Sequence, residues 1–140
     1  MKHTSRSSQA TTQKVIDVIQ HFVDRWNAKD LTQFGELFEP DAEYTAVTGN
    51  TYLGQQNIVK EHIYPFTTVN KNAAMTMDKL LIRDLSDQLT MVTADWTVTG
   101  STSPEGEALP ARVGVMQAVI NQENWLIRLV CTNDTVDLYQ

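Results

Sequence analysis

Residues Asp41–Phe66, which read DAEYTAVTGNTYLGQQNIVKEHIYPF, contain the change from strand to helix that decides the fold. Apolar and polar residues alternate over Glu43–Val47, as expected of a strand with one buried face. Gly49 and Asn50 form a turn signal, and a second short extended piece ends at Gly54. This part of the stretch therefore predicts a strand, a turn and a second extended segment.

Three helices are predicted around these extended segments. Apolar residues recur at steps of three and four over Thr12–Ala28, which gives a helix one buried face. A second helix, Leu31–Phe38, is expected to stop before Pro40, because the residue preceding a proline avoids the helical region. The third helix, Gln55–Tyr64, is limited by Pro65.

Only strands are predicted downstream of the third helix. Their short connections make neighbouring strands antiparallel. Three helices must then cover one face of a strongly curved, mostly antiparallel sheet, an α+β fold shaped like a cone. The open end of such a cone leaves a cavity between helices and sheet. The four strands are Ala74–Leu85, Leu89–Gly100, Leu109–Ile120 and Trp125–Thr135.

Length and composition limit the possible classes of protein. The 140 residues fit one domain, assigned to residues 12–140, and polar residues 1–11 predict a disordered N-terminal tail. A formal net charge of -6 without a basic stripe excludes nucleic acid as an expected partner. No apolar run is long enough for a membrane span or signal peptide, and the single cysteine, Cys131, suits a reducing compartment. A cytoplasmic protein is therefore expected.

Several short motifs follow one another in an order that resembles a known superfamily. They are WNAKD at 26–30, LFEPDA at 37–42, VTG at 47–49, GQQNIVKEH at 54–62, ADW at 94–96, RVG at 112–114 and WLI at 125–127. The chain resembles the NTF2-like superfamily, also described as SnoaL-like or cystatin-like, and within it the SgcJ/EcaC group close to DUF4440. This fold hosts isomerases, dehydratases, cyclases, hydrolases and binding modules, so the resemblance specifies the fold more than the function.

The resemblance also implies a homodimer formed through the outer face of the long sheet. No cofactor is expected, because the chain lacks a glycine-rich phosphate loop followed by an acidic residue. Ketosteroid isomerases of this fold use an Asp base with a Tyr and a protonated Asp as oxyanion donors. The corresponding positions here are Phe22 for the Tyr, Ala46 for the base and Met116 for the protonated Asp, so that chemistry is not expected.

His62 is the sharpest candidate for a catalytic residue. The resemblance places a pocket-facing histidine at this position, and an imidazole can bind a ligand or transfer a proton near neutral pH. The alternative is a core histidine whose ring bonds to a backbone carbonyl or a neighbouring acid. Asp95 adjoins Trp96 in a strand, so the two face opposite sides of the sheet. A catalytic His62–Asp95 pair is therefore excluded if Trp96 lines the pocket.

Arg112 is the second candidate, since the resemblance points it into the mouth of the cone. A guanidinium there can bind a carboxylate through two hydrogen bonds. The alternative is a structural ion pair with Asp78, Asp95 or Glu43.

The predicted pocket combines these groups with aromatic and apolar walls. Each ring can also be read as ordinary core packing, and Cys131 as a buried structural thiol. No metal site is expected, because the three histidines show no ligand spacing and the cysteine is alone. The predicted pocket residues are Phe22, Trp26, Tyr44, Tyr52, His62, Trp96, Arg112, Met116 and Cys131.

Three functions remain open from the sequence. The first is a module that binds a small, largely hydrophobic molecule in the cone. The second is an acid-base enzyme of the cyclase, dehydratase or isomerase type that uses His62. The third is a protein-interaction or dimerisation module whose cavity is filled by its own side chains.

Overall fold

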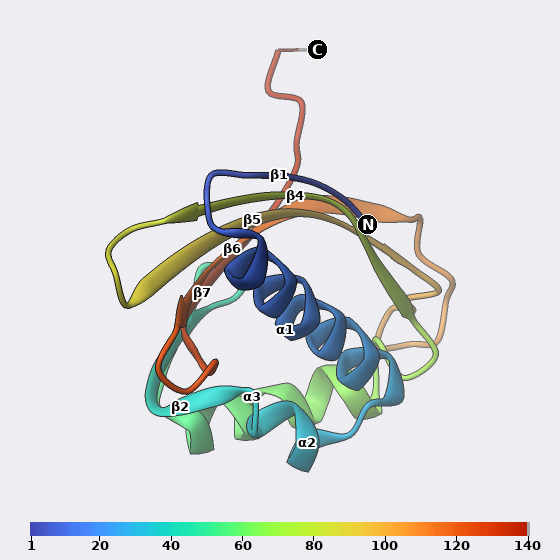
Figure 1. Cartoon of the computed structure of the whole chain (residues 1–140). Coiled ribbons are helices and arrows are strands. Elements are labelled where there is room, and N and C mark those ends of the chain that lie inside the picture. The colour runs from blue at the N-terminus through green and yellow to red at the C-terminus, as the bar shows by residue number, and fades with distance from the viewer. Residues whose placement is uncertain (140) are drawn as a thin grey trace.

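The computed structural model of the chain describes residues 1–139, which form one sheet and three helices. Figure 1 shows the sheet arching over the helices, with α1 lying directly beneath it. The strands are β1 (Lys2–Ser5), β2 (Phe38–Thr45), β3 (Thr51–Leu53), β4 (Ala74–Asp84), β5 (Leu89–Thr99), β6 (Arg112–Asn121) and β7 (Ile127–Asp134). The helices are α1 (Gln9–Ala28), α2 (Leu31–Gly35) and α3 (Gln55–Thr67).

The sheet is curved and does not close. Its strand order is β1-β4-β5-β6-β7-β2-β3, in which β4 to β7 form the predicted antiparallel meander. Strand β1 pairs in parallel with β4, and β2 pairs in parallel with β7 and antiparallel with the edge strand β3. Register shifts interrupt β4–β5, β6–β7 and β2–β7, and such bulges increase local twist and bend the strands. The predicted α+β fold with helices on one face of a strongly curved, mostly antiparallel sheet is confirmed.

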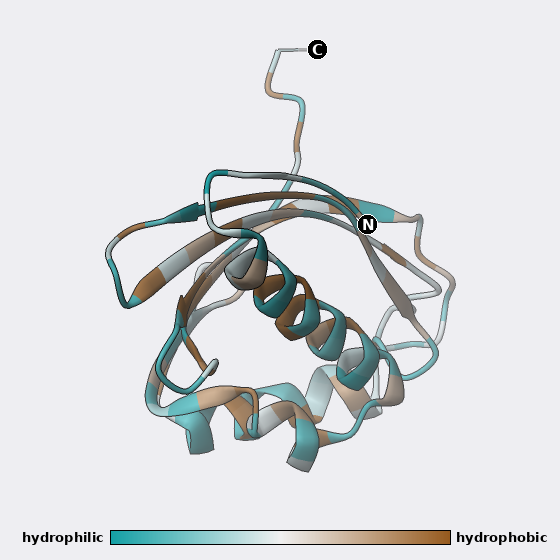
Figure 2. Cartoon of the chain, in the orientation of Figure 1, coloured by the Kyte–Doolittle hydropathy of each residue, from teal (hydrophilic) through white to brown (hydrophobic). Residues whose placement is uncertain are grey.

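The core lies between the inner face of the sheet and the helices. Val15, Ile19 and Phe22 of α1 are buried, as their spacing predicts. Along β5 the buried and less buried residues alternate, with Val92 and Ala94 fully buried. Hydrophobic residues recur along α1 and the strands above it (Figure 2). No helix within residues 1–139 is long and apolar enough to cross a membrane.

The N-terminal residues differ from the predicted disordered tail. Lys2–Ser5 form β1 on the edge of the sheet, and the amide of Arg6 donates to the carbonyl of Ile82 at 2.9 Å. Helix α1 begins at Gln9, after an N-cap at Ser8 whose hydroxyl accepts from the Thr11 amide at 3.1 Å. Because β1 is held mainly by backbone pairing with β4, its polar side chains give no sequence signal for a strand.

The boundary between α2 and β2 also differs from the prediction. Asp30 caps α2 as its spacing indicates, since its side chain accepts from the Gln33 amide at 3.0 Å. The helix nevertheless ends at Gly35, and Phe38 already belongs to β2. Pro40 lies within this strand, where the register shifts between Phe38 and Glu43. A proline is tolerated there because a bulge leaves its position without a required amide bond.

Helix α3 continues beyond the predicted stop at Pro65 and ends at Thr67. A proline removes one hydrogen bond from a helix but does not prevent the following turn. The amide of Thr68 still donates to the Tyr64 carbonyl at 2.9 Å. The consequence for the site is an additional turn that brings Phe66 under the sheet, where it is buried.

Candidate functional site

A cavity of about 440 Å³ lies between the inner face of the sheet and helices α1 and α3. It falls within the size range of small-molecule sites. All predicted pocket residues except Cys131 line it; they are Phe22, Trp26, Tyr44, Tyr52, His62, Trp96, Arg112 and Met116.

Cys131, which was predicted as a pocket residue, does not line the cavity. Counting every second residue from the buried Ile127 would turn Cys131 inward. The register of β6 with β7 shifts between Val119 and Ile120, so Arg128 is an extra residue in β7. Val130 and Thr132 consequently face inward, and Thr132 lines the cavity in place of Cys131.

His62 occupies an aromatic box beside the cavity. It is only 6% exposed, and the ring centroids of Tyr44 and Phe34 lie 4.8 and 4.9 Å from its own. Phe66 and Tyr52 complete the box at 5.5 and 6.4 Å. Burial lowers the pKa of His62 below its ordinary value of 6.5, so the imidazole is neutral near pH 7.

The tautomer of His62 follows from one hydrogen bond. Nδ1 lies 2.7 Å from the carbonyl oxygen of Ile58, one turn earlier on α3. A carbonyl only accepts hydrogen bonds, so Nδ1 carries the proton and Nε2 keeps a free lone pair. The sequence left two alternatives for His62, a core histidine bonded to the backbone and a histidine facing the cavity. The side chain combines them, because Nδ1 bonds to the Ile58 carbonyl and the residue lines the cavity.

Tyr44 supplies a second polar group to the cavity wall, next to His62. Its ring is nearly parallel to that of Tyr52, with an interplanar angle of 15° and centroids 6.4 Å apart. Burial, with Tyr52 nearby, raises the pKa of Tyr44 well above its ordinary value of 10.0. The phenol therefore stays protonated and can both donate and accept a hydrogen bond.

Arg112 of β6 and Trp96 of β5 line the cavity from the sheet. The guanidinium donates to Asp134 at 2.7 Å and lies 5.6 Å from the Trp96 ring centroid. The predicted partners of Arg112 were Asp78, Asp95 and Glu43, and the observed partner is instead the acid that the β6–β7 register places nearby, because Gly114 pairs with Asp134.

Trp96 and Asp95 face opposite sides of the sheet, as alternation predicts. Trp96 is buried against the cavity and Asp95 is exposed. A His62–Asp95 pair is therefore absent. Among residues 1–139, no acidic side chain bonds to either ring nitrogen of His62.

Trp26, which lines the cavity at the end of α1, is held in place by contacts that were not predicted from the sequence. Lys29 lies over the indole with Nζ 3.8 Å from the ring centroid, and Nζ donates to the Ala73 carbonyl at 2.7 Å. Burial lowers the pKa of Lys29 to about 8. Asn27 exchanges two hydrogen bonds with the backbone of Met75, at 2.7 and 3.0 Å, which ties the end of α1 to β4.

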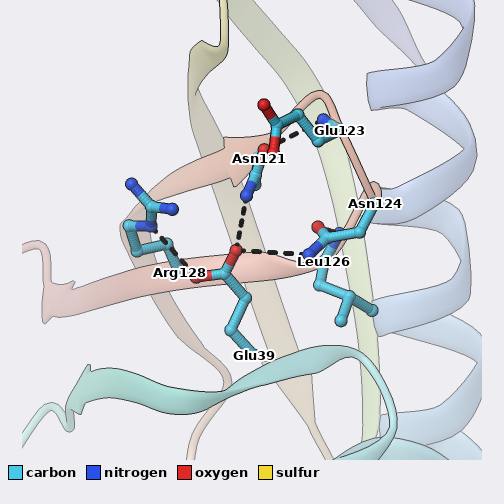
Figure 3. A network of polar contacts seen from close by, with 6 residues as sticks. All are labelled: Glu39, Asn121, Glu123, Asn124, Leu126 and Arg128. Atoms are coloured by element: carbon cyan, nitrogen blue, oxygen red, sulfur yellow. Dashed lines mark hydrogen bonds and ion pairs between the residues drawn. The ribbon is translucent and has the colours of Figure 1, made fainter.

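A second polar cluster lies outside the cavity, between β2 and the β6–β7 hairpin (Figure 3). The buried carboxylate of Glu39 accepts from Asn121 at 2.8 Å, Arg128 at 3.0 Å and Asn124 at 3.4 Å. The Arg128 hydrogen bond lowers the pKa of Glu39 below its ordinary value of 4.5. All its bonds join parts of the fold, which indicates a structural role. Within the described chain, residues 1–139, no group of three His, Cys, Asp or Glu side chains is arranged to hold a metal ion.

The family of the chain follows from a match of residues 19–123 to the family model described as SnoaL-like domain. This match covers most of the sequence, and the chain belongs to the SnoaL-like domain family. No curated protein sequence matches the chain. The narrower assignment to the SgcJ/EcaC or DUF4440 group stays a prediction.

Solved structures share this fold at low sequence identity. An uncharacterised protein with a cystatin-like fold from Caulobacter vibrioides is 17% identical, with a TM-score of 0.81 over 89% of each chain. An NTF2-like superfamily protein from Salmonella enterica is 17% identical, with a TM-score of 0.78 over 94% of this chain and 96% of that one. A ketosteroid isomerase-like protein from Erwinia carotovora is 11% identical, with a TM-score of 0.78 over 93% of this chain and all 100% of the other.

These likenesses establish the fold alone. The three positions that the resemblance aligns with isomerase groups, Phe22, Ala46 and Met116, all line the cavity. Their side chains are apolar and cannot act as acids or bases. His62 is thus the one imidazole that borders the cavity among the described residues.

Proposed function

We propose that the protein binds a small, largely hydrophobic molecule in the cavity. The observation that carries this proposal is an open volume of about 440 Å³ whose walls are mainly aromatic and aliphatic side chains. Burying such a ligand is favourable in proportion to the apolar surface removed from water. A few polar groups, His62 and Tyr44 among them, then orient the ligand.

The same geometry supports binding better than acid-base catalysis. Among residues 1–139 no carboxylate hydrogen-bonds to the His62 ring, and Arg112 is already paired with Asp134 at 2.7 Å. One observation favours the enzyme as a second candidate, namely the neutral His62 ring at the cavity wall, which can accept a proton. The open volume gives little support to an interaction module with a filled cavity.

A cavity-filling substitution tests the proposal. N-Phenyl-1-naphthylamine, a neutral fluorescent probe, is titrated into the wild type and into Ala46→Phe, whose added ring enters the cavity. We expect saturable one-to-one binding that weakens at least about tenfold in the variant, because the ring removes buried ligand contacts. Glu43→Phe, on the exposed side of β2, which ends one residue before Ala46, is the matched control. Wild-type protein without saturable binding, or an unaffected Ala46→Phe, contradicts the proposal.

We further propose the homodimer that the resemblance implies. The outer face of the sheet carries Val113, which is 51% exposed, beside the half-buried Val115 and Val119. Such apolar residues are suited to a two-fold interface. Sedimentation at micromolar concentration should give a dimer that Val115→Lys dissociates and Gln56→Lys, on the exposed surface of α3, leaves intact. A wild type that sediments only as monomer refutes this.

A further inference from the structure

Two polar atoms on the cavity wall, His62 Nε2 and the Tyr44 hydroxyl oxygen, have no hydrogen-bond partner among residues 1–139. No described side chain or carbonyl bonds to His62 Nε2 or to the Tyr44 hydroxyl. Neither atom is sealed, because the one sealed side-chain nitrogen or oxygen without a partner in the described chain is Trp96 Nε1. Since His62 and Tyr44 both line the cavity, both atoms are open to its contents.

The two atoms have complementary hydrogen-bonding capacities. The bond from Nδ1 to Ile58 makes Nε2 an acceptor, so it requires an O–H or N–H from its partner. The Tyr44 phenol has its own proton to donate. The ring centroids of the two side chains are 4.8 Å apart, so the two side chains are direct neighbours on the cavity wall. A hydroxyl donates one hydrogen bond and accepts another, whereas an ether or a ketone cannot donate to Nε2.

The charges around the cavity favour a neutral ligand. Arg112 is paired with Asp134, which leaves no free cation of its own to attract an anion. Glu61 lines the cavity as an acidic residue, and the chain carries a formal net charge of -6. An anionic ligand would therefore lose its hydration without gaining an unpaired cation.

From this arrangement we infer that the ligand is an uncharged aromatic molecule with a hydroxyl group, whose O–H donates to His62 Nε2 while its oxygen accepts from Tyr44. The near-parallel rings of Tyr44 and Tyr52 and the wall formed by Trp96 suit a flat body. This inference rests on the proposed binding function and adds to it the chemical class of the ligand.

A matched series of biphenyls tests the hydroxyl separately from the apolar body. Binding of 4-phenylphenol, 4-fluorobiphenyl and biphenyl-4-carboxylate is measured at pH 7.5 by displacement of N-phenyl-1-naphthylamine. We expect 4-phenylphenol to bind about tenfold more tightly than 4-fluorobiphenyl, the effect of one well-formed neutral hydrogen bond, and the carboxylate to bind most weakly. His62→Phe should abolish this preference, and His21→Phe, on the exposed side of α1, should retain it.

A measurement on the wild type keeps the test independent of whether His62→Phe folds. Nitrogen-15 NMR of the histidine ring should show Nδ1 protonated and Nε2 unprotonated, with the Nε2 shift responding to 4-phenylphenol and not to 4-fluorobiphenyl. Equal affinity for these two compounds, tightest binding of the carboxylate, or a proton on Nε2 overturns the inference and leaves the proposed binding function standing. Failure of every probe to bind overturns both.

Discussion

Gly114 allows the Trp96 indole to lie against β6, and adding one methyl group there should disrupt the cavity wall. Trp96 pairs directly with Gly114 across β5 and β6. A Cβ built on Gly114 falls well inside 3.0 Å of both the Trp96 ring and the Asn133 carbonyl oxygen, a separation that real Cβ atoms essentially never show. Because Gly114 has no positive φ, the cost of Gly114→Ala arises from these contacts and not from backbone strain.

The expected cost is about 3 kcal/mol of unfolding free energy, the upper end for an overpacked core, because one of the two obstacles is backbone in β7. Urea unfolding followed by far-ultraviolet circular dichroism measures it independently of the tryptophan signal. The displaced indole should also weaken binding of N-phenyl-1-naphthylamine, because Trp96 lines the cavity.

Two variants isolate the cause. Gly49→Ala adds a methyl where no heavy atom lies within 4 Å but φ is +89°, and should cost about 1 kcal/mol from strain alone. Adding Trp96→Phe to Gly114→Ala should restore part of the loss, since the smaller ring relieves one clash and the Asn133 carbonyl remains. A Gly114→Ala protein within about 0.5 kcal/mol of the wild type would refute the reasoning.

Three further predictions concern protonation and the N-terminal strand. Because the pKa of His62 is lowered in the fold, the unfolded chain binds the proton more readily, and the free energy of unfolding should fall as pH drops below 6.5. Urea midpoints measured at several pH values should show this dependence in the wild type and a weaker dependence in His62→Gln. Because the fold lowers the pKa of Glu39, the charged carboxylate stabilises the protein at pH 7, and this stabilisation should be lost as pH falls below 4.5 and the carboxylate is protonated. The wild type should therefore be more stable than Glu39→Gln at pH 7 and lose this advantage in acid; equal urea midpoints of the two proteins at pH 7 would contradict this. The Arg6 amide, bonded to Ile82 at 2.9 Å, should exchange its hydrogen at least about tenfold more slowly than in an unstructured peptide, and exchange at the peptide rate would show that β1 is not paired.

Most of the fold was predictable because its signals are local. The spacing of Val15, Ile19 and Phe22 specifies a helix with one buried face, and the alternation along Leu89–Thr99 specifies a half-buried strand. Strand β1 could not be predicted in this way, since its pairing depends on the free edge of β4 and not on its own side chains. The end of α2 at Gly35 was missed because the bulge that accommodates Pro40 involves β7, a strand far along the chain.

The candidate site was predictable as a set of residues and less so in its contacts. Trp96 and Met116 face the cavity because alternation holds through β5 and β6. Cys131 does not line the cavity, contrary to the prediction, because the extra residue Arg128 reverses the alternation in β7. The partner of Arg112 was misassigned because Asp134 approaches it only through the register of β7 with β6.

The amino-acid sequence by itself determined the identity and order of the helices and long strands, and that aromatic side chains would gather beneath the sheet, because hydrophobic periodicity acts within each segment. Only the tertiary structure decided the bulges, the edge strand, and the hydrogen bond that leaves His62 Nε2 open to the cavity. These features depend on which backbone groups pair between segments that are distant in the sequence, and the residue pattern of one segment does not specify its pairing partner.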